Sequence, residues 1–324
     1  MTESQQQQDL RHDEVQAGTT TGLAAPSIDV TNERQNSLWS DAWKTLKRNP
    51  LFWIGAVFGL FFTLMAIAPQ WFARGADPRS CDLANSRDTP SSEHWFGFDQ
   101  QGCDYLANVV YGARSSLIIG VTAVLVVLLL GVVVGAVAGY FGGFTDGLLA
   151  RIADIFYGLP LILGALVLLR VGPSTDIPII NTRGPGAVAL ALALFGWMTA
   201  MRLVRSQVIA VKSSDYVAAA RAMGASSPRI LVRHILPNAV APVLVYATIT
   251  IGVLIAAEAT LTYLGVGLQR PAISWGLQID AGQDLLRTAP HLVLFPSLIL
   301  TLTVMAFIMM GDALRDALDP RQRA

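Results

Sequence analysis

The stretch DYVAAARAMGASSPRILVRHILPN at residues 215–238 decides the fold, because it is a basic segment set between two strongly apolar ones. Its first part, from Asp215 to Met223, predicts a short helix, since it contains three consecutive alanines and neither glycine nor proline. Gly224 follows directly, and glycine accepts the left-handed conformation that closes a helix. The sequence therefore predicts a helix that ends at Gly224.

A second helix is expected immediately after this bend. Ser227 is a suitable N-cap residue, and Pro228 suits the first helical position because the N–H group that it lacks would be unpaired there. We expect this helix to end at Pro237. Residues 215–238 thus form two short helices joined by a glycine bend, and they separate two segments that are long enough to cross a membrane.

The composition places most of the chain in lipid. Of its 324 residues, 53% are hydrophobic and only 14% are charged, and the mean hydropathy is +0.49. An average soluble protein is about a quarter charged. The net charge is zero, which gives no electrostatic reason to expect a nucleic acid as partner. We therefore expect an all-α membrane protein.

Six apolar segments approach or meet the length of about 17 to 25 residues that a membrane-spanning helix needs. In rough bounds they are Leu51–Ala68, Ser116–Tyr140, Ile152–Leu169, Gly186–Met201, Ala239–Thr260 and Leu292–Met310. The third segment contains Pro160, which predicts a kink in that helix. The sequence therefore predicts a protein with six membrane spans.

The distribution of lysine and arginine gives the orientation, because these residues are enriched in cytoplasmic loops. If the N-terminus is cytoplasmic, 15 of the 23 lysines and arginines lie on the cytoplasmic side. The loop at residues 215–238 then lies in the cytoplasm as well. We expect both termini to be cytoplasmic.

The N-terminal region is polar and then amphipathic. Residues 1–36 contain runs of glutamine and threonine, which predict a disordered tail, and they lack the pattern of a cleaved signal peptide. Residues 37–49 predict an amphipathic helix at the membrane surface, or simply the first turns of the next span. The expected organisation is a tail at 1–36, an interfacial helix at 37–49, a first span with a long extracytoplasmic loop at 50–115, a core at 116–311 and a cytoplasmic tail at 312–324.

The long loop after the first span contains both cysteines, Cys81 and Cys103. Because this loop is expected outside the cytoplasm, a disulfide is permitted, and it would stabilise the loop by about 3 kcal/mol in the chain-entropy model. Two unrelated free thiols are the alternative. The four histidines are scattered and there is no CxxC pair, so no metal site is expected.

Two acidic residues fall within the apolar segments. Glu258, near the outer end of the fifth span, is costly in a membrane and must face a partner or water. It either contacts cargo on a transport pathway or forms a structural ion pair with Arg270 or with a second membrane subunit. Asp154 is expected to pair with Arg151, three residues earlier on the same helix.

Three glycines in the second span, Gly131, Gly135 and Gly139, recur at every fourth residue. This spacing lets two helices approach closely. It is compatible with a contact to a second membrane subunit and equally with a contact inside the chain.

The loop at residues 215–238 resembles the cytoplasmic EAA loop of the membrane-spanning subunits of ABC importers. The family pattern is Glu-Ala-Ala, three residues, Gly, nine residues and Ile-x-Leu-Pro. The matching residues are Ala219, Ala220, Gly224, Leu236 and Pro237. Ala218 stands at the Glu position and His234 at the Ile position, so the chain departs from the pattern twice.

Three further segments resemble the C-type permease subunits of dipeptide and oligopeptide importers. The first is HWFGFDQQGCDYLANVVYGARSSL at residues 94–117, which is similar to the family segment before the second span. Its matching positions are His94, Gly97, Asp99, Gly102, Asp104, Tyr111, Gly112, Arg114, Ser116 and Leu117, and it departs at Phe98 and Cys103. The others are residues 263–276, with YLGVG and SWG, and residues 311–321, GDALRDALDPR. The resemblance covers the chain from about residue 38 onward.

This resemblance implies a type I ABC importer permease fold with six transmembrane helices and a cytoplasmic coupling-helix loop. It also implies a second homologous permease, one or two ATP-binding subunits, an extracytoplasmic solute-binding protein and a location in the lipid of the cell membrane. ATP and Mg would belong to the partner subunits, and this chain would bind no cofactor, since it has no GxxxxGK[ST] loop. The residues assigned to the coupling loop are Asp215, Tyr216, Ala218, Ala219, Ala220, Arg221, Ala222, Gly224, Ala225 and Pro237.

The function expected from the resemblance is ATP-driven import of di- or oligopeptides. Nickel or another small solute is the alternative cargo within the same family. A stand-alone channel or secondary carrier is a different class, which would be expected to show several buried ionisable groups or paired broken helices. The chain has one such group, Glu258, and no clear repeat. It contains no HExxH or GxSxG motif, so we expect no enzymatic activity and no catalytic residue.

Overall fold

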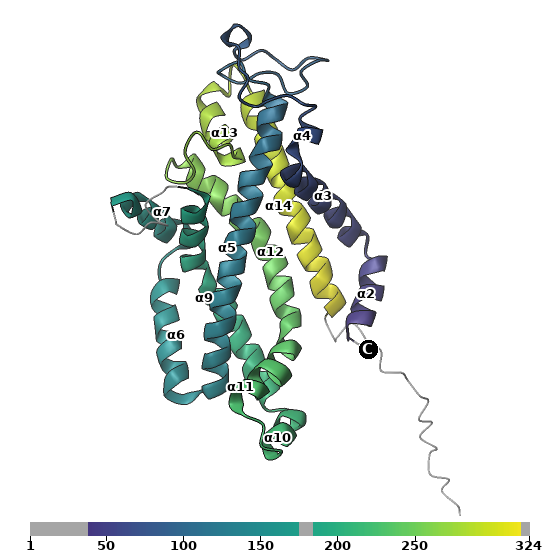
Figure 1. The fold of residues 1–324 in the computed structure, drawn as a ribbon, viewed down its shortest axis with the longest axis vertical. Coiled ribbons are helices and arrows are strands. Elements are labelled where there is room, and N and C mark those ends of the chain that lie inside the picture. Colours follow the sequence, from purple (N-terminus) through teal and green to yellow (C-terminus); the bar gives the residue numbers. More distant parts are fainter. Residues whose placement is uncertain (1–37, 175–183, 319–324) are drawn as a thin grey trace, which may run out of the picture. The chain divides into compact units, whose positions relative to one another are not determined.

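The computed structural model describes residues 38–174 and 184–318, which form helices joined by short turns and one long loop at residues 73–104 (Figure 1). The α-helices are α2 (Leu38–Arg48), α3 (Pro50–Ile67), α4 (Pro69–Phe72), α5 (Tyr105–Phe141), α6 (Gly143–Tyr157), α7 (Leu161–Val171), α9 (Pro185–Lys212), α10 (Asp215–Ala222), α11 (Ser227–Ile230), α12 (Leu236–Tyr263), α13 (Trp275–Gly282) and α14 (His291–Leu318). Shorter turns are η1 (Leu83–Asn85), η2 (Gly172–Ser174), the π-helical η3 (Leu231–Ile235) and η4 (Gln283–Leu285). The tail expected at residues 1–36 lies outside the described residues.

Five helical segments are long and apolar enough to cross a membrane. They are α3, α5, α9, the continuous segment from α11 to α12, and α14. The bent pair α6 and α7 makes a sixth if it is counted as one span. The prediction of an all-α membrane protein is therefore confirmed.

The third expected span is not one kinked helix. α6 and α7 meet at an angle of 79° at the break that contains Gly158 and Pro160. Proline has no N–H group for the helical ladder, and its ring disfavours the helical conformation of the residue before it. The sequence located this break correctly, but the change of direction is far larger than the kink that we expected from Pro160.

Several helices extend beyond their apolar cores. α5 begins at Tyr105 because Asp104 caps it: its Oδ1 accepts a hydrogen bond from the backbone N–H of Ala107 at 2.9 Å. α14 continues to Leu318, so the segment 312–318, which was expected to belong to a tail, is helical. Residues 319–324 lie outside the described part of the chain.

The three glycines of α5 face α9 of the same chain. A Cβ atom on Gly131 would lie 2.4 Å from Cβ of Ala200, and one on Gly135 would lie 2.5 Å from the carbonyl oxygen of Met201. A Cβ atom on Gly139 would lie 2.9 Å from the carbonyl oxygen of Arg205, one turn further along α9. Of the two alternatives for these glycines, the structure shows packing inside the chain.

Two ion pairs join α9 to α6 next to this glycine contact. Arg205 binds Asp146 through both oxygens of the carboxylate, with a contact of 2.6 Å between Nη2 and Oδ2. Arg202 binds Asp154 at 2.7 Å. The expected pairing of Asp154 with Arg151 is therefore wrong, because a cation from the neighbouring helix approaches the carboxylate more directly than one from its own helix.

α14 packs between α3 and α12 (Figure 1). Glycines make both contacts close: a Cβ on Gly55 of α3 would lie 2.8 Å from the carbonyl oxygen of Ala306, and one on Gly252 of α12 would lie 2.9 Å from that of Val304. The amphipathic α2 packs Ala42 and Leu46 against the last turns of α14. The glycine contacts hold α14 by close backbone packing on both sides.

Candidate functional site

The segment at residues 213–235, here called the α10–α11 loop, contains all the residues assigned to the coupling loop except Pro237, which lies at the start of α12. α10 runs from Asp215 to Ala222, as the sequence predicted, with Ser214 at its N-cap position. Gly224 has a φ of +82°, and an added Cβ would meet no atom within 4 Å. The backbone conformation therefore favours glycine at this position, whereas crowding by neighbouring atoms does not.

The second helix of the loop differs from the expectation. Ser226, not Ser227, is the N-cap residue, and the helix does not end at Pro237. The chain instead passes through the π turn η3 directly into α12, with the N–H of Leu236 donating to the carbonyl of Leu231. The wider π turn accommodates a proline that has no N–H for an ordinary α-helical bond. The correction is that α11, η3 and α12 form one continuous segment.

One face of α10 is anchored to the rest of the protein. Val217 is fully buried and Ala220 nearly so. Val217 packs in a cluster with Tyr140 of α5, Val208 of α9 and Ile235 of η3. Lys212 stabilises the same contact between α9 and α5. Its ammonium group donates a hydrogen bond to the carbonyl of Tyr140 and lies 5.5 Å from the centre of the Tyr140 ring. The helix is thus fixed to the ends of several long helices.

The other face of α10 is exposed, and three of its residues are alanines, which have small side chains. The predicted residues on it are Asp215, Tyr216, Ala218, Ala219, Arg221 and Ala222, and Gly224 and Pro237 are also exposed. Met223 is 82% exposed at the end of the helix. Of the predicted loop residues, Ala220 lies on the anchored face and Ala225 is half-buried. The exposed surface has room for close approach by another protein.

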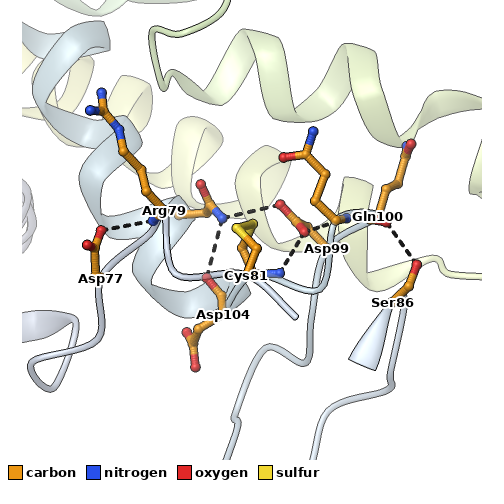
Figure 2. Close-up of a disulfide and its surroundings, with 10 residues drawn as sticks. Asp77, Arg79, Cys81, Ser86, Asp99, Gln100 and Asp104 are labelled. Carbon is orange, nitrogen blue, oxygen red and sulfur yellow. Dashed lines mark hydrogen bonds between the residues drawn. A yellow bond between two sulfur atoms is a disulfide. The ribbon is translucent and has the colours of Figure 1, made fainter. Parts of the chain in front are cut away.

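The other end of α5 meets a second structured region, the cap, which we define as residues 73–104 and 264–290. α5 has 37 residues, so the cap and the α10–α11 loop are about 55 Å apart along it. Within the cap, Cys81 and Cys103 form a disulfide (Figure 2). Asp99 lies beside it and accepts hydrogen bonds from the backbone N–H groups of Gln101 and Cys103.

Contacts between distant parts of the sequence close the cap. Tyr105 donates a hydrogen bond of 2.5 Å to the carbonyl of Leu292, and Trp275 donates one of 2.9 Å to the carbonyl of Val109. The rings of Phe96 and Phe295 stack with centres 3.9 Å apart. The sequence did not single out these contacts, although the SWG segment that contains Trp275 was a signal for this docking.

Glycines in the matched segments allow this close packing. A Cβ on Gly102 would lie only 1.7 Å from the carbonyl oxygen of Asp82, and Gly102 also has a φ of +73°. In the YLGVG and SWG segments, a Cβ on Gly267 would lie 2.3 Å from Oγ1 of Thr262, and one on Gly276 would lie 2.8 Å from Cβ of Thr262. These glycines hold the turn after α12 against its last residues.

Glu258 lies beneath this turn and is fully buried. Its Oε1 accepts a hydrogen bond of 2.9 Å from Thr262, whose own oxygen accepts one from the N–H of Leu268. Oε2 of Glu258 and the hydroxyl of Ser116 are buried and have no hydrogen-bond partner among the described residues. The hydroxyl of Thr262 is therefore the hydrogen-bond donor that the described part of the chain supplies to this carboxyl group.

Neither expected role of Glu258 is seen in this structure. Among the described residues it has no ion pair, and Arg270 is exposed while Glu258 is not. The carboxyl group is fully buried in this structure, and its contact with cargo or with a second subunit stays a prediction.

Within the described residues, no group of three or more histidine, cysteine or acidic side chains is arranged to hold a metal ion. The two regions with distinctive structure are therefore the α10–α11 loop at one end of α5 and the cap at the other. The loop presents an exposed surface that includes three alanines, and the cap is held together by hydrogen bonds and a disulfide within the chain.

Comparisons with known proteins cover nearly the whole chain. The family described as "Binding-protein-dependent transport system inner membrane component" matches residues 131–324, and the "N-terminal TM domain of oligopeptide transport permease C" matches residues 37–87. The oligopeptide transport system permease protein OppC of Bacillus subtilis is 37% identical over 92% of this chain and 95% of its own length. The dipeptide transport system permease protein DppC of the same organism is 38% identical over 89% of this chain and 87% of its own.

A glutathione transport system permease protein, GsiD of Shigella dysenteriae, is 36% identical over 90% of this chain and 93% of its own. Among solved structures, an inward-facing form of the MetNI methionine ABC transporter matches with a TM-score of 0.53 and 22% identity, over 65% of this chain and 96% of the matched one. This last likeness concerns the fold alone. The family match spans more than half of the chain and relatives align over most of its length, so the chain belongs to the family of binding-protein-dependent transport system inner membrane components.

Proposed function

We propose that this chain is the C-type permease subunit of an ATP-driven peptide importer in the cell membrane, and that it forms the transport pathway with a second, homologous permease. The family supports the role in transport, and the relatives at 36–38% identity are named for oligopeptide, dipeptide and glutathione transport. Di- or oligopeptides are therefore the proposed cargo, ahead of nickel or another small solute.

The α10–α11 loop is the proposed contact with an ATP-binding subunit, and its two-faced structure is the observation that carries the proposal. The exposed alanines 218, 219 and 222 allow another protein to approach the backbone of α10. Val217 on the opposite face is packed against α5, α9 and η3. A displacement of α10 by a partner is therefore passed directly to the long helices. ATP and Mg would be bound by that partner, which would hydrolyse the ATP.

The proposed orientation places both termini and the α10–α11 loop in the cytoplasm, as the excess of lysine and arginine on that side favours. The cap then lies outside the cytoplasm, where a disulfide such as Cys81–Cys103 persists. We propose that an extracytoplasmic solute-binding protein delivers cargo at this end of the permease.

The test is affinity purification of the tagged chain from its own membrane in a gentle detergent, followed by mass spectrometry of the proteins and small molecules that accompany it. We expect a second permease, one or two ATP-binding subunits and a solute-binding protein that carries peptides. An unrelated membrane protein with the same tag is the control. If the chain purifies alone or as a homo-oligomer in repeated trials, the importer proposal fails and a stand-alone channel or carrier takes its place.

Cargo is tested separately by uptake into cells with and without the gene. Loss of labelled dipeptide uptake on deletion, with unchanged uptake of nickel, supports peptide transport. The reverse pattern would replace peptides with nickel as the cargo.

A further inference from the structure

α9 has an exposed polar side in the half that leads to the α10–α11 loop. Within residues 190–206 the exposed positions are Thr199, Arg202 and Ser206, which we call the polar stripe. Their spacing of three and four residues places them on one side of the helix. The opposite side of α9 packs closely against the glycines of α5. α9 therefore has one side that is buried in the protein and another that is exposed and hydrophilic.

The polar stripe belongs to a segment that is long and apolar enough to cross a membrane. This segment ends at Lys212, and a lysine at the end of a spanning helix places its charge at the membrane surface. Ser206 and Thr199 are six and thirteen residues from Lys212, or about 9 and 20 Å along the helix. The hydrocarbon core of a membrane is about 30 Å thick. The stripe therefore lies at the depth of the lipid tails.

α3 shows the kind of surface that suits contact with lipid. Every exposed residue of this helix is apolar: Pro50, Leu51, Trp53, Ile54, Val57, Phe58, Leu60, Phe61, Leu64 and Ile67. Lipid tails offer no hydrogen bonds, and a charged side chain at this depth faces water or another protein instead. The polar stripe differs from α3 in this respect, so lipid does not cover it.

An ion pair beside the stripe favours water over a second protein. Arg202 binds Asp154 of α6 at 2.7 Å, and the two side chains remain 48% and 49% exposed. The guanidinium group also lies 4.4 Å from the centre of the Tyr157 ring. The interiors of protein interfaces are poor in charged residues, and removing an ion pair from water costs free energy that its attraction often fails to offset. A half-exposed pair therefore fits a water-filled space better than the interior of a protein interface.

We propose that the polar stripe, together with Asp154 and Tyr157, lines the water-filled pathway by which cargo crosses the membrane. This inference rests on the proposed function, which supplies the cargo. A di- or oligopeptide has charged ends and polar amide groups, and these lose free energy in surroundings that cannot bind them. The hydroxyls of Thr199 and Ser206 and the Arg202–Asp154 pair provide a polar surface along its route.

The test places a single thiol in the stripe. The native cysteines are joined in a disulfide, so Thr199→Cys and Ser206→Cys each supply one reactive thiol on this chain. Inside-out membrane vesicles that contain the complete complex, without nucleotide, are treated with a charged methanethiosulfonate reagent that does not cross lipid. Mass spectrometry of this chain follows the reaction. The reagent attacks the thiolate, and a thiol in apolar surroundings forms little thiolate.

Val57→Cys and Leu64→Cys on α3 are the matched controls. Both positions are exposed, and they lie seven and fourteen residues from Pro50, or about 10 and 21 Å along the helix. They therefore match Ser206 and Thr199 in distance from the helix end but lie on an apolar surface. We expect the two stripe variants to react about tenfold faster than the controls, or more, because water reaches the stripe.

Peptide uptake then distinguishes a pathway from a hydrated surface that carries no cargo. After the reaction, the complex is purified and reconstituted into proteoliposomes with its solute-binding protein and ATP. Attachment of a bulky reagent to the Ser206→Cys variant should lower dialanine uptake about tenfold relative to the same variant left untreated. The Val57→Cys variant should show no change on treatment.

Equal reaction rates in the stripe and control variants would overturn the proposal, and so would rapid reaction without loss of uptake. Rapid reaction only in the chain purified without its second permease would place that subunit on the stripe and would also overturn it. Dialanine uptake by the untreated wild-type complex separates this inference from the proposed function. Uptake with slow labelling of the stripe rejects the pathway assignment alone, whereas absence of uptake counts against the proposed function.

Discussion

The cap and the α10–α11 loop lie at opposite ends of α5 and are built on different principles. In the cap, hydrogen bonds join residues 73–104 and 264–290 to each other and to α5, and a disulfide links two parts of the first segment. In the α10–α11 loop, one face of α10 is buried and the other is left exposed. The difference is that the cap is joined by contacts within the chain, whereas the α10–α11 loop leaves exposed the face that we propose as the contact with an ATP-binding subunit.

Three glycines make this comparison quantitative. Gly75 and Gly102 in the cap and Gly224 in the α10–α11 loop have nearly the same φ, at +78°, +73° and +82°. Only Gly102 is crowded, while an added Cβ on Gly75 or Gly224 would meet nothing within 4 Å. Substitution at these positions therefore separates the cost of backbone conformation from the cost of packing.

The largest effect is expected for Gly102→Ala. Its Cβ would lie 1.7 Å from the backbone carbonyl of Asp82, and backbone cannot move aside as a flexible side chain can. We expect the amount of folded protein in the membrane to fall at least tenfold. Gly75→Ala is the control and should cost only about 1–2 kcal/mol, the usual penalty for a left-handed non-glycine residue. Equal abundance of the two variants would show that the cap is not closely packed at Gly102.

The disulfide is expected to have the next largest effect. Replacement of Cys81 and Cys103 by serine should lower the free energy of unfolding by about 3 kcal/mol. The reason is that the cross-link between these residues, 22 positions apart, would no longer restrict the unfolded chain. Thermal denaturation of the purified protein in detergent measures this. Thiol labelling of the unreduced, unfolded wild-type protein should find no free thiol, and two labelled cysteines would show that the bond is absent.

A substitution in the α10–α11 loop is expected to spare the fold and affect transport. Gly224→Trp should leave the protein in the membrane, because the position is exposed and uncrowded. Peptide uptake should fall at least tenfold while ATP hydrolysis by the complex continues. The reason is that the tryptophan side chain would prevent the bend at residue 224 from fitting against the ATP-binding subunit. Gly224→Asn is the control, because asparagine tolerates the left-handed conformation. Uptake at the normal rate in Gly224→Trp would contradict our account of the loop.

The smallest effect is expected at Glu258, despite its full burial. Glu258→Gln keeps an oxygen for Thr262 and should change the free energy of unfolding by less than about 1 kcal/mol. A double-mutant cycle with Arg270→Gln should give a coupling energy near zero, because the two residues form no ion pair. A coupling above about 1 kcal/mol would place a cation near Glu258 after all.

The elements that the sequence predicted well depend on local information. Apolar runs located the spans, and the alanines before Gly224 located α10 and its end. Pro160 located the break between α6 and α7, but proline does not determine the 79° angle, which depends on how the two helices pack. Local propensity thus predicted where helices begin and end better than it predicted their directions.

The contacts that the sequence missed join residues far apart in the chain. The partner of Asp154 is Arg202, 48 residues away, and no helical spacing rule connects them. The hydrogen-bond donor to Glu258 is the hydroxyl of Thr262, and threonine is common in apolar segments and gives no recognisable pattern. Gln278 donates a hydrogen bond to the carbonyl of Asn108, 170 residues away, and no local pattern predicts this contact. Contacts of this kind can be recognised only in the folded structure.

The closed cap has a consequence for the order in which this protein can be made. Three hydrogen bonds in the cap or directly beside it join residues 98–105 to residues 281–292, separated by 181, 187 and 193 positions along the chain. A ribosome finishes the first group long before it reaches the second. The cysteine pair spans only 22 positions, so oxidation can shape the early half of the cap while the later helices are still being synthesised. The early half is then ready when its partners arrive with the last membrane span.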